Sequence, residues 1–289
     1  MNDINNTTDG QNSLLFADDS TNYEIGSDYF NLVRKINLNL EQLRIWFICN
    51  KLSLNVLKTE AMLFCRRIVY HPLPPVLFDG QPIPFSFNVK FLGLHLDHKL
   101  SWKAHINIVR NKLSGVSGIL HNIRKQITSK IAKNLYYTLA YPHLIYGNLL
   151  WSSTSPSNLK PIIIAQKRLI RTIAQIKYND HTHPVYIEYR ILKFNDICKF
   201  NLASYVFKCL NGLIFSPVQF APRELNNYII RNPNVLNIPN VRTTQSQLFV
   251  LFRGSSTWNN LPNDVREART LFCFKRRLKQ HLLNNYNII

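Results

Sequence analysis

The hydrophobic positions of the first 97 residues predict short strands around one long helix. The run Asn12 to Phe16 (NSLLF) is typical of a strand that enters a tight turn at Ala17-Asp18-Asp19. Ser27 is placed to cap a helix that is expected to run to about Asn50. The apolar residues of this helix recur every three or four positions and form one stripe, made of Leu32, Ile36, Leu40, Leu43 and Phe47.

Three shorter segments complete this first part. Thr59 to Cys65 (TEAMLFC) is predicted to be a partly buried strand. Asp79-Gly80 is a dipeptide typical of hairpin turns, and it lies among five prolines. Phe91 to Leu96 (FLGLHL) is predicted to be another short strand.

Beyond Asp97 the hydrophobic period changes from that of strands to that of helices. A long series at i, i+3/i+4 and i+7 spacing predicts an amphipathic helix, with the members Trp102, His105, Ile106, Val109, Leu113, Val116, Leu120 and Ile123. Further helices are expected near 129–151, 157–176 and 194–211. Pro142 is expected to kink or divide the first of these, and Asn211-Gly212 to end the last.

The pattern as a whole predicts an α+β protein in three parts. Residues 1–97 combine strands with one helix, residues 98–215 are mainly helical, and residues 216–289 are rich in Pro and Asn before a final helix over Leu271 to Leu283.

Charge is distributed unevenly over these parts. Residues 1–97 hold 8 Lys/Arg and 10 Asp/Glu, residues 98–215 hold 17 and 3, and residues 216–289 hold 10 and 3. The net charge of +19 favours a polyanionic partner, with nucleic acid first among the candidates. A uniformly solvated basic surface is the alternative that charge alone leaves open.

Several classes of protein are excluded by the composition. With 46% hydrophobic residues the chain is not intrinsically disordered, and no apolar run approaches the roughly 20 residues of a membrane span. The polar N-terminus does not resemble a signal peptide, and the five cysteines form no C-x-x-C pair. We therefore expect buried free thiols and an intracellular protein, in the nucleus or the cytoplasm, that is not secreted and has no membrane partner.

Asp18-Asp19 is the sharpest chemical signal in the sequence. Adjacent carboxylates at the tip of a hairpin can direct hard oxygen ligands at a divalent cation such as Mg²⁺. Paired ions of this kind activate an attacking hydroxyl and stabilise a leaving pyrophosphate in phosphoryl transfer. A solvent-facing turn or a helix cap is the other interpretation of the same tripeptide, Ala-Asp-Asp.

Three stretches in this order resemble the reverse transcriptase of non-LTR, jockey-like retrotransposons: FADDS (16–20), NKLSLNVLKTEAMLF (50–64) and VKFLGLHLDHKLSWKAHI (89–106). The resemblance continues through LIYGNLLW (144–151), QKRLIRTIA (166–174) and WNNLPNDVREARTLFCFKRRLKQHLL (258–283). It implies a partial polymerase palm with a primer-grip-like hairpin over 1–97, a basic thumb-like domain over 98–215 and a C-terminal basic module over 216–289.

The resemblance also implies roles for single residues. Asp18 and Asp19 would be the metal-binding, catalytic carboxylates, with Mg²⁺ as the cofactor, and Lys58 would approach the nucleotide phosphates. Phe91, Leu92 and Gly93 would place the primer terminus. The alternatives are a surface lysine at position 58 and an ordinary core strand at 91–93, and Trp102 is expected to be a core residue and not a platform for stacked bases.

The expected partners are an RNA template and an RNA–DNA duplex, while the sequence indicates no particular protein partner. Their phosphates would be bound by basic residues of three predicted helices, namely Lys103, Arg110, Lys112, Lys167, Arg168, Arg171, Lys275, Arg276, Arg277 and Lys279. A solvated helix face explains the last four equally well.

The sequence departs from the resembled family at one decisive point. That family has fingers and a first palm motif, with another metal-binding Asp, well before the A-D-D hairpin, whereas here only 17 residues precede Asp18. We therefore expect the C-terminal portion of an RNA-directed DNA polymerase that is inactive by itself. The alternative is a non-catalytic nucleic-acid-binding protein derived from such an element.

Overall fold

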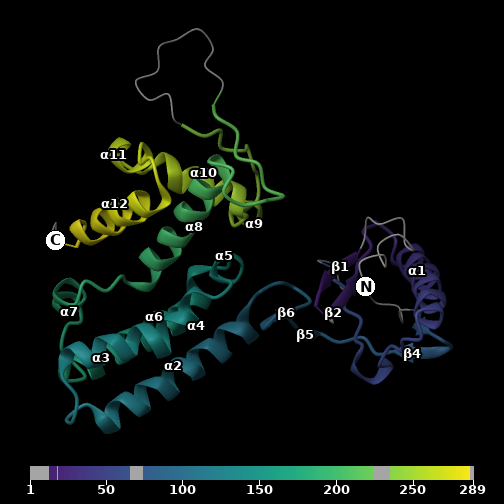
Figure 1. The fold of residues 1–289 in the computed structure, drawn as a ribbon, viewed down its shortest axis with the longest axis horizontal. Helices are drawn as coiled ribbons and strands as arrows, with labels where there is room; N and C mark the ends of the chain where they lie inside the picture. Colours follow the sequence, from purple (N-terminus) through teal and green to yellow (C-terminus); the bar gives the residue numbers. More distant parts are fainter. Residues whose placement is uncertain (1–12, 18, 66–73, 224–234, 287–289) are drawn as a thin grey trace. The chain divides into compact units, whose positions relative to one another are not determined.

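The computed structural model describes residues 13–17, 19–65, 74–223 and 235–286 (Figure 1). The chain divides into two compact units, Met1–Ser101 and Trp102–Ile289. The first combines antiparallel hairpins with a long helix and the second is helical, so the predicted α+β class is confirmed.

The first unit begins with a hairpin of β1 (Ser13–Phe16) and β2 (Asp19–Asn22), as the NSLLF pattern predicts. Helix α1 (Tyr29–Cys49) follows, and its N-cap is Asp28, one residue beyond the predicted Ser27. The Asp28 carboxylate accepts hydrogen bonds from the backbone N–H groups of Phe30 and Asn31, both at 3.2 Å, which satisfies two donors that the helix itself leaves unpaired.

A second hairpin closes the core of this unit. Strands β3 (Val76–Phe78) and β4 (Gln81–Ile83) are joined by the predicted Asp79-Gly80 turn, whose φ angles of 50° and 73° match a type I′ turn. The core consists of Val33, Leu40, Leu43, Trp46, Phe47, Val76, Phe78 and Ile83.

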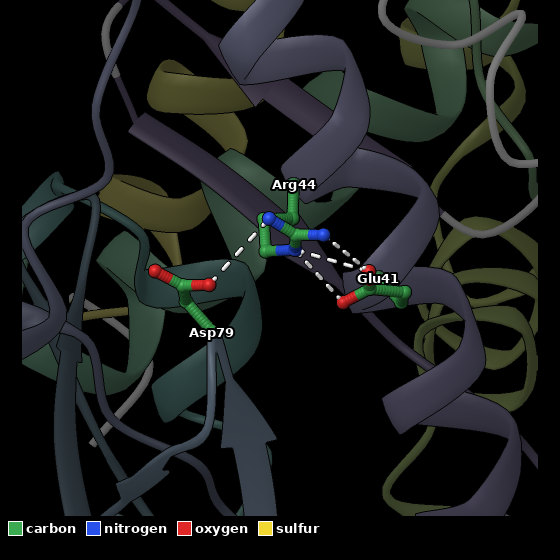
Figure 2. A network of polar contacts seen from close by, with 3 residues as sticks. All are labelled: Glu41, Arg44 and Asp79. Carbon is green, nitrogen blue, oxygen red and sulfur yellow. Dashed lines mark hydrogen bonds and ion pairs between the residues drawn. The ribbon is translucent and has the colours of Figure 1, made fainter.

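Arg44 connects α1 to the turn of this hairpin (Figure 2). Its guanidinium donates hydrogen bonds of 2.7 to 3.0 Å to the Glu41 carboxylate, and its Nη1 lies 3.5 Å from Asp79 Oδ1. The Arg44 bond lowers the pKa of Glu41. Since these groups are exposed, the network positions the turn more than it stabilises the fold.

The predicted strand over 59–65 is wrong apart from a single bridge. Helix η2 (Val56–Lys58) precedes it, and only Ala61 pairs, with Phe85. Ala61 donates to the Pro84 carbonyl at 3.0 Å and accepts from Ser86 at 2.8 Å. Pro82 and Pro84 have no N–H group that could donate a further hydrogen bond to this strand, so the pairing stays limited to one bridge.

The predicted strand over 91–96 is in fact the turn and flanks of a third hairpin. Strands β5 (Asn88–Phe91) and β6 (Leu94–Asp97) pair in antiparallel fashion around Leu92 and Gly93. Both turn residues have positive φ, 45° and 80°, so Gly93 supplies a backbone conformation that the turn requires.

The second unit is built on the packing of α2 (Lys103–Ile123) against α6 (Pro156–Ala174). The predicted stripe of α2 is buried from His105 to Leu120, along with Trp102 at its N-cap, whereas Ile123 is half-buried. A continuous row of ring contacts leads inward from Trp102 through His105 and Trp151 to Phe194, whose ring stacks on Trp151 with centroids 5.5 Å apart.

The predicted helix over 129–151 is interrupted by a π-helical turn just before Pro142, where a kink or division was expected, and it breaks at Tyr146 and Gly147, whose backbones are extended and left-handed. The segment forms α3 (Ser129–Leu135), the π-helical turn η3 (Tyr136–Ala140), α4 (Tyr141–Ile145) and α5 (Asn148–Trp151). A proline cannot donate to the carbonyl one turn earlier, and the wider turn at η3 accommodates this loss.

Helix α8 (Phe194–Leu210) is the centre of the remaining packing. It follows α7 (His183–Glu188), ends at Asn211-Gly212 as predicted, and contacts α10 (Val250–Asn259) and α12 (Leu271–Asn284). Two short helices, α9 (Thr244–Gln247) and α11 (Asn263–Arg266), complete the unit.

Cysteine burial differs from the expectation. All five thiols are free, but Cys198 alone is buried and Cys49 is exposed, because Cys49 lies at the solvent-facing end of α1. Within the described residues no helix is long and apolar enough to cross a membrane.

Candidate nucleic-acid interface

The A-D-D segment lies at the tip of the β1–β2 hairpin. Asp19 is the first residue of β2, is exposed and pairs with Phe16 across the ladder. Ala17 in the connection has φ 53°, a conformation that costs a non-glycine residue energy. Asp18, the other predicted metal ligand and catalytic residue, lies outside the described residues.

The described residues do not form a magnesium site. Among them, no three His, Cys, Asp or Glu side chains gather where they could hold a metal ion. Mg²⁺ is usually held by one or two carboxylates together with water and phosphate oxygens in a near-octahedral shell. The exposed carboxylate of Asp19 does not by itself fit that requirement, and we derive no metal-dependent step from it.

The structure places Lys58 and the primer-grip-like residues at other points of the first unit. Lys58 ends η2 and is exposed. Phe91 and Leu92 are half-buried and Gly93 is exposed at the β5–β6 turn. Their predicted roles at the nucleotide phosphates and the primer terminus stay predictions.

Asp97 is a structural residue that the sequence pattern did not single out. Its carboxylate accepts from the backbone N–H groups of Lys99 and Ser101, at 3.2 and 2.9 Å, and from the Ser101 hydroxyl at 3.2 Å. These bonds fix the turn that follows β6. The D-x-x-x-S spacing in this stretch is the signal that could have indicated such a turn.

The predicted basic residues of α2 and α6 differ in exposure and in whether the protein itself holds their side chains. Lys103, Arg110 and Lys112 are exposed on the side of α2 away from its buried stripe, and Lys167 and Arg168 are exposed on α6. Arg171 is half-buried instead. Its Nε donates to the Asp180 carbonyl at 3.2 Å and its guanidinium lies over the Tyr178 ring, so it holds a loop in place.

The basic residues of α12 show a similar division. Arg276 is exposed, Lys275 is half-buried, and Arg277 donates to the Asp264 carbonyl. The ammonium of Lys279 lies 5.7 Å from the centre of the Tyr137 ring.

Lys279 belongs to a cluster of three cations that the sequence did not predict. Burial lowers the pKa of Lys279, and the nearby charges of Lys133 and Arg190 lower it further. The three residues come from α3, from the turn after α7 and from α12. No sequence signal could have joined them, since they meet only through tertiary packing. We call Lys133, Arg190 and Lys279 the cation cluster.

A second basic site surrounds Lys193, just before α8. Burial lowers the pKa of Lys193, Asp196 opposes that effect and the charge of Lys167 adds to it. The Lys193 ammonium lies 2.9 Å from His183 Nδ1 and 4.3 Å from the centre of the Tyr286 ring. These contacts orient a cation beside a cavity of about 310 Å³ that Lys167 also lines.

The helical unit as a whole has far more positive charge than its own carboxylates can neutralise. Residues 102–289 contain 26 Lys/Arg and 6 Asp/Glu. Within the part of this unit that the structure describes, Lys199 forms an ion pair with Asp196 at 3.4 Å. Cations that are close to each other and lack carboxylate partners favour an external polyanion.

The chain is similar to polymerases of mobile elements. It is 26% identical to the RNA-directed DNA polymerase from mobile element jockey of Drosophila melanogaster over 142 residues, which are 48% of this chain and 15% of that protein. It is 26% identical to the probable RNA-directed DNA polymerase from transposon X-element of the same organism, over 35% of this chain and 11% of that protein. A third relative is the putative 115 kDa protein in type-1 retrotransposable element R1DM, 24% identical over 99 residues.

These matches confirm the resemblance to non-LTR retrotransposon polymerases that the sequence motifs indicate. The chain spans less than a fifth of the length of each of these curated relatives. No family model matches the chain, and no solved structure matches it.

Proposed function

We propose that this chain is a C-terminal portion of a retrotransposon RNA-directed DNA polymerase, and that its helical unit binds the phosphate backbone of an RNA template or an RNA–DNA duplex. The observation that carries the proposal is the excess of cations in residues 102–289, gathered in sites such as the cation cluster. The names of the relatives agree with it, because each of the first two is an RNA-directed DNA polymerase.

The energetics of the cation cluster support phosphate binding. Burial lowers the pKa of Lys279, and the charges of Lys133 and Arg190 lower it further, so these two cations repel the Lys279 ammonium in the free protein. A phosphate placed among them would relieve this repulsion and release counterions from the nucleic acid. Contacts of this kind position a duplex without reading its sequence.

In this proposal the first unit corresponds to part of the polymerase palm. The Asp18-Asp19 hairpin would be the Mg²⁺-binding element, Lys58 would lie near the nucleotide phosphates, and residues 91–93 would contact the primer end. The 289 residues contain no segment that resembles the first metal-binding motif of the family, so we expect this polypeptide alone to extend no primer.

Duplex binding by the 289-residue chain tests the proposal. Fluorescence anisotropy with a labelled primed RNA–DNA duplex should show affinity falling about 10³-fold or more between 50 and 200 mM salt, because several phosphates are neutralised. Salt-insensitive binding, or none, would contradict the proposal.

A matched pair of triple variants tests the location of the interface. Lys133→Gln/Arg190→Gln/Lys279→Gln should weaken binding and reduce the salt slope by about one per lost phosphate contact. Arg34→Gln/Lys35→Gln/Lys90→Gln removes the same charges from exposed positions of the first unit and should leave binding unchanged. Equal loss in both would indicate a diffuse charge effect.

A primer-extension assay tests the expected inactivity of this polypeptide, which the alternative of a non-catalytic nucleic-acid-binding protein derived from the retroelement also predicts. We expect no extension with Mg²⁺, primed template and nucleotides. Measurable extension that Asp18→Ala abolishes would refute both the inactivity of this polypeptide and the binding-only alternative.

A further inference from the structure

A cavity of about 280 Å³ lies between α8 and α10 in the helical unit, and its lining contains none of the predicted binding residues. Its lining includes the side chains of Ser152, Cys198, Lys199, Arg253, Ser256 and Thr257. Ser152 and Cys198 are buried at its base, whereas Lys199 is exposed at its rim. The cavity therefore combines a sheltered floor with access from solvent.

Arg253 is the unusual residue of this cavity. It extends from α10, and its Nη2 donates a hydrogen bond to Ser152 Oγ at 3.1 Å. Its Nη1 is fully buried and has no hydrogen-bond partner among the described residues. A buried donor of a charged group that lacks a partner destabilises the folded protein, so the polar environment of Arg253 is incomplete.

No carboxylate among the described residues forms an ion pair with Arg253. The packed elements α5, α6 and α10 contain no acidic residue, and the structure shows no ion pair to Arg253 within its described ranges. The carboxylate of α8, on Asp196, is engaged elsewhere. It pairs with Lys199 at 3.4 Å and accepts from the Tyr286 hydroxyl at 2.6 Å.

The neighbouring thiol does not act as the counter-ion either. Burial raises the pKa of Cys198 to about 12, more than its hydrogen bond to Ser152 and the Arg253 charge lower it. Cys198 is therefore a neutral thiol at physiological pH. The cavity offers a guanidinium, an ammonium and the hydroxyls of Ser256 and Thr257, which can all donate hydrogen bonds.

We propose that this cavity binds a phosphate group, with Arg253 as its principal ligand and Lys199, Ser256 and Thr257 as further donors. A phosphate accepts hydrogen bonds on every oxygen and pairs readily with a guanidinium. It would supply the negative charge that no ion pair in the described ranges provides beside the guanidinium. The source is either a backbone phosphate of bound nucleic acid, in which case the inference rests on the proposed function, or a free phosphate.

Thermal melts of the full chain test the site itself. Inorganic phosphate, added at constant ionic strength against chloride, should raise the melting temperature saturably, by about 3–6 °C at ten times its dissociation constant. Arg253→Gln should abolish this rise, while Arg269→Gln, which removes an exposed arginine of the same unit, should retain it. A rise that is equal in all three proteins, or that never saturates, would overturn the proposal.

A second set of variants keeps the test valid if Arg253→Gln fails to fold, which circular dichroism will show. Lys199→Gln and the double variant Ser256→Ala/Thr257→Val leave the guanidinium in place. Each should weaken the phosphate response about threefold or more. Responses identical to that of the parent protein would contradict the assignment of these donors.

Duplex titrations identify the source of the phosphate. If it is a backbone phosphate, Arg253→Gln should reduce the salt slope of duplex binding by about one. An unchanged slope with a phosphate-specific melting shift would assign the site to free phosphate. If the parent protein binds no duplex but its melting temperature rises with phosphate, the proposed function is contradicted and the phosphate site is supported. If it binds the duplex normally but shows no melting shift with phosphate, the phosphate site is contradicted and the proposed function is supported.

Discussion

The side chain of Gln166 is the polar centre of the helical unit. It is 1% exposed, and its amide makes four hydrogen bonds. The Nε2 group donates to Tyr136 Oη and to the Leu192 carbonyl, both at 3.0 Å, and Oε1 accepts from Tyr186 Oη at 3.1 Å and from the Phe194 N–H at 2.8 Å. One residue thus joins η3, α7 and the start of α8 to α6 in a fully satisfied network.

Gln166→Leu should lower the free energy of unfolding by about 2–4 kcal/mol, because it leaves buried donors and acceptors of four partners unpaired. Urea titration followed by circular dichroism measures the change. Gln126→Leu, at an exposed position, should alter stability by less than about 0.5 kcal/mol. A small effect at Gln166 would mean that the network contributes little.

The reactivity of Cys198 follows from its raised pKa. The thiolate is the nucleophile, and with a pKa of about 12 very little of it exists at pH 8. Iodoacetamide should therefore modify exposed Cys49 in the native protein and leave Cys198 unmodified until the protein is unfolded. Reactivity of native Cys198 should rise only as the pH approaches 12. Peptide mass mapping after timed labelling checks this, and fast labelling at pH 8 would contradict it.

Among the elements, the packing of α10 against α8 depends on the absence of one side chain. A Cβ on Gly254 would lie 2.7 and 2.9 Å from the ring of Phe220 and 3.0 Å from Val206 Cγ2. Both neighbours are buried. The glycine is thus required by the close approach of the Phe220 ring and of Val206 on α8, and not by backbone conformation.

The same substitution at two glycines of the helical unit should therefore have opposite effects. Gly254→Ala should lower stability by about 1–3 kcal/mol through overpacking. Gly115→Ala should raise it by about 0.5–1 kcal/mol, because this exposed position in α2 has open space around it and alanine favours the helix. Melting temperatures of the two variants, compared with the parent protein, measure the contrast. Stabilisation by Gly254→Ala would show that the α8–α10 contact is looser than described.

Elements with a strong local signal were predicted well from the sequence. The stripe of α2, the Asp79-Gly80 turn and the stop at Asn211-Gly212 each depend on neighbouring residues alone. The start of α1 was displaced by one residue because Ser27 and Asp28 are both good caps. The FLGLHL run was assigned to one strand because its apolar residues outweighed Gly93, which is the turn signal.

The candidate site was harder to predict than the elements. The exposed cations of α2 and α6 follow from the helical period, but Lys133, Arg190 and Lys279 meet only after α3, the turn after α7 and α12 have packed. The cavity at Arg253 likewise requires α8 and α10 to be in contact. Residues far apart in the sequence meet only in the folded protein, and no local sequence pattern indicates which of them will meet.

On the scale of the whole molecule, the two units have separate hydrophobic cores. The core of the first consists of the eight residues around Trp46 and Phe47, whereas the second buries several times as many apolar side chains. Stability increases with the apolar area removed from water, so the first unit should be the weaker.

We therefore expect unfolding in two steps, with the first unit melting first. Trp46 reports on that unit, and Trp102, Trp151 and Trp258 report on the helical one. Fluorescence-monitored urea unfolding should show an early transition that Trp46→Phe removes, while the far-ultraviolet circular dichroism keeps a later, larger one. One coincident transition by both probes would contradict this expectation.

The excess of Lys and Arg over Asp and Glu in the helical unit affects how much of this protein is unbound inside a cell. Polycationic proteins bind nucleic acid non-specifically with dissociation constants of roughly 10⁻⁴–10⁻⁶ M at physiological salt. In any compartment rich in RNA, bulk transcripts therefore compete for the same Lys and Arg side chains that would hold a specific duplex. If the helical unit binds phosphates as proposed, abundant RNA would hold much of the protein in non-specific complexes and lower the amount available to any one template.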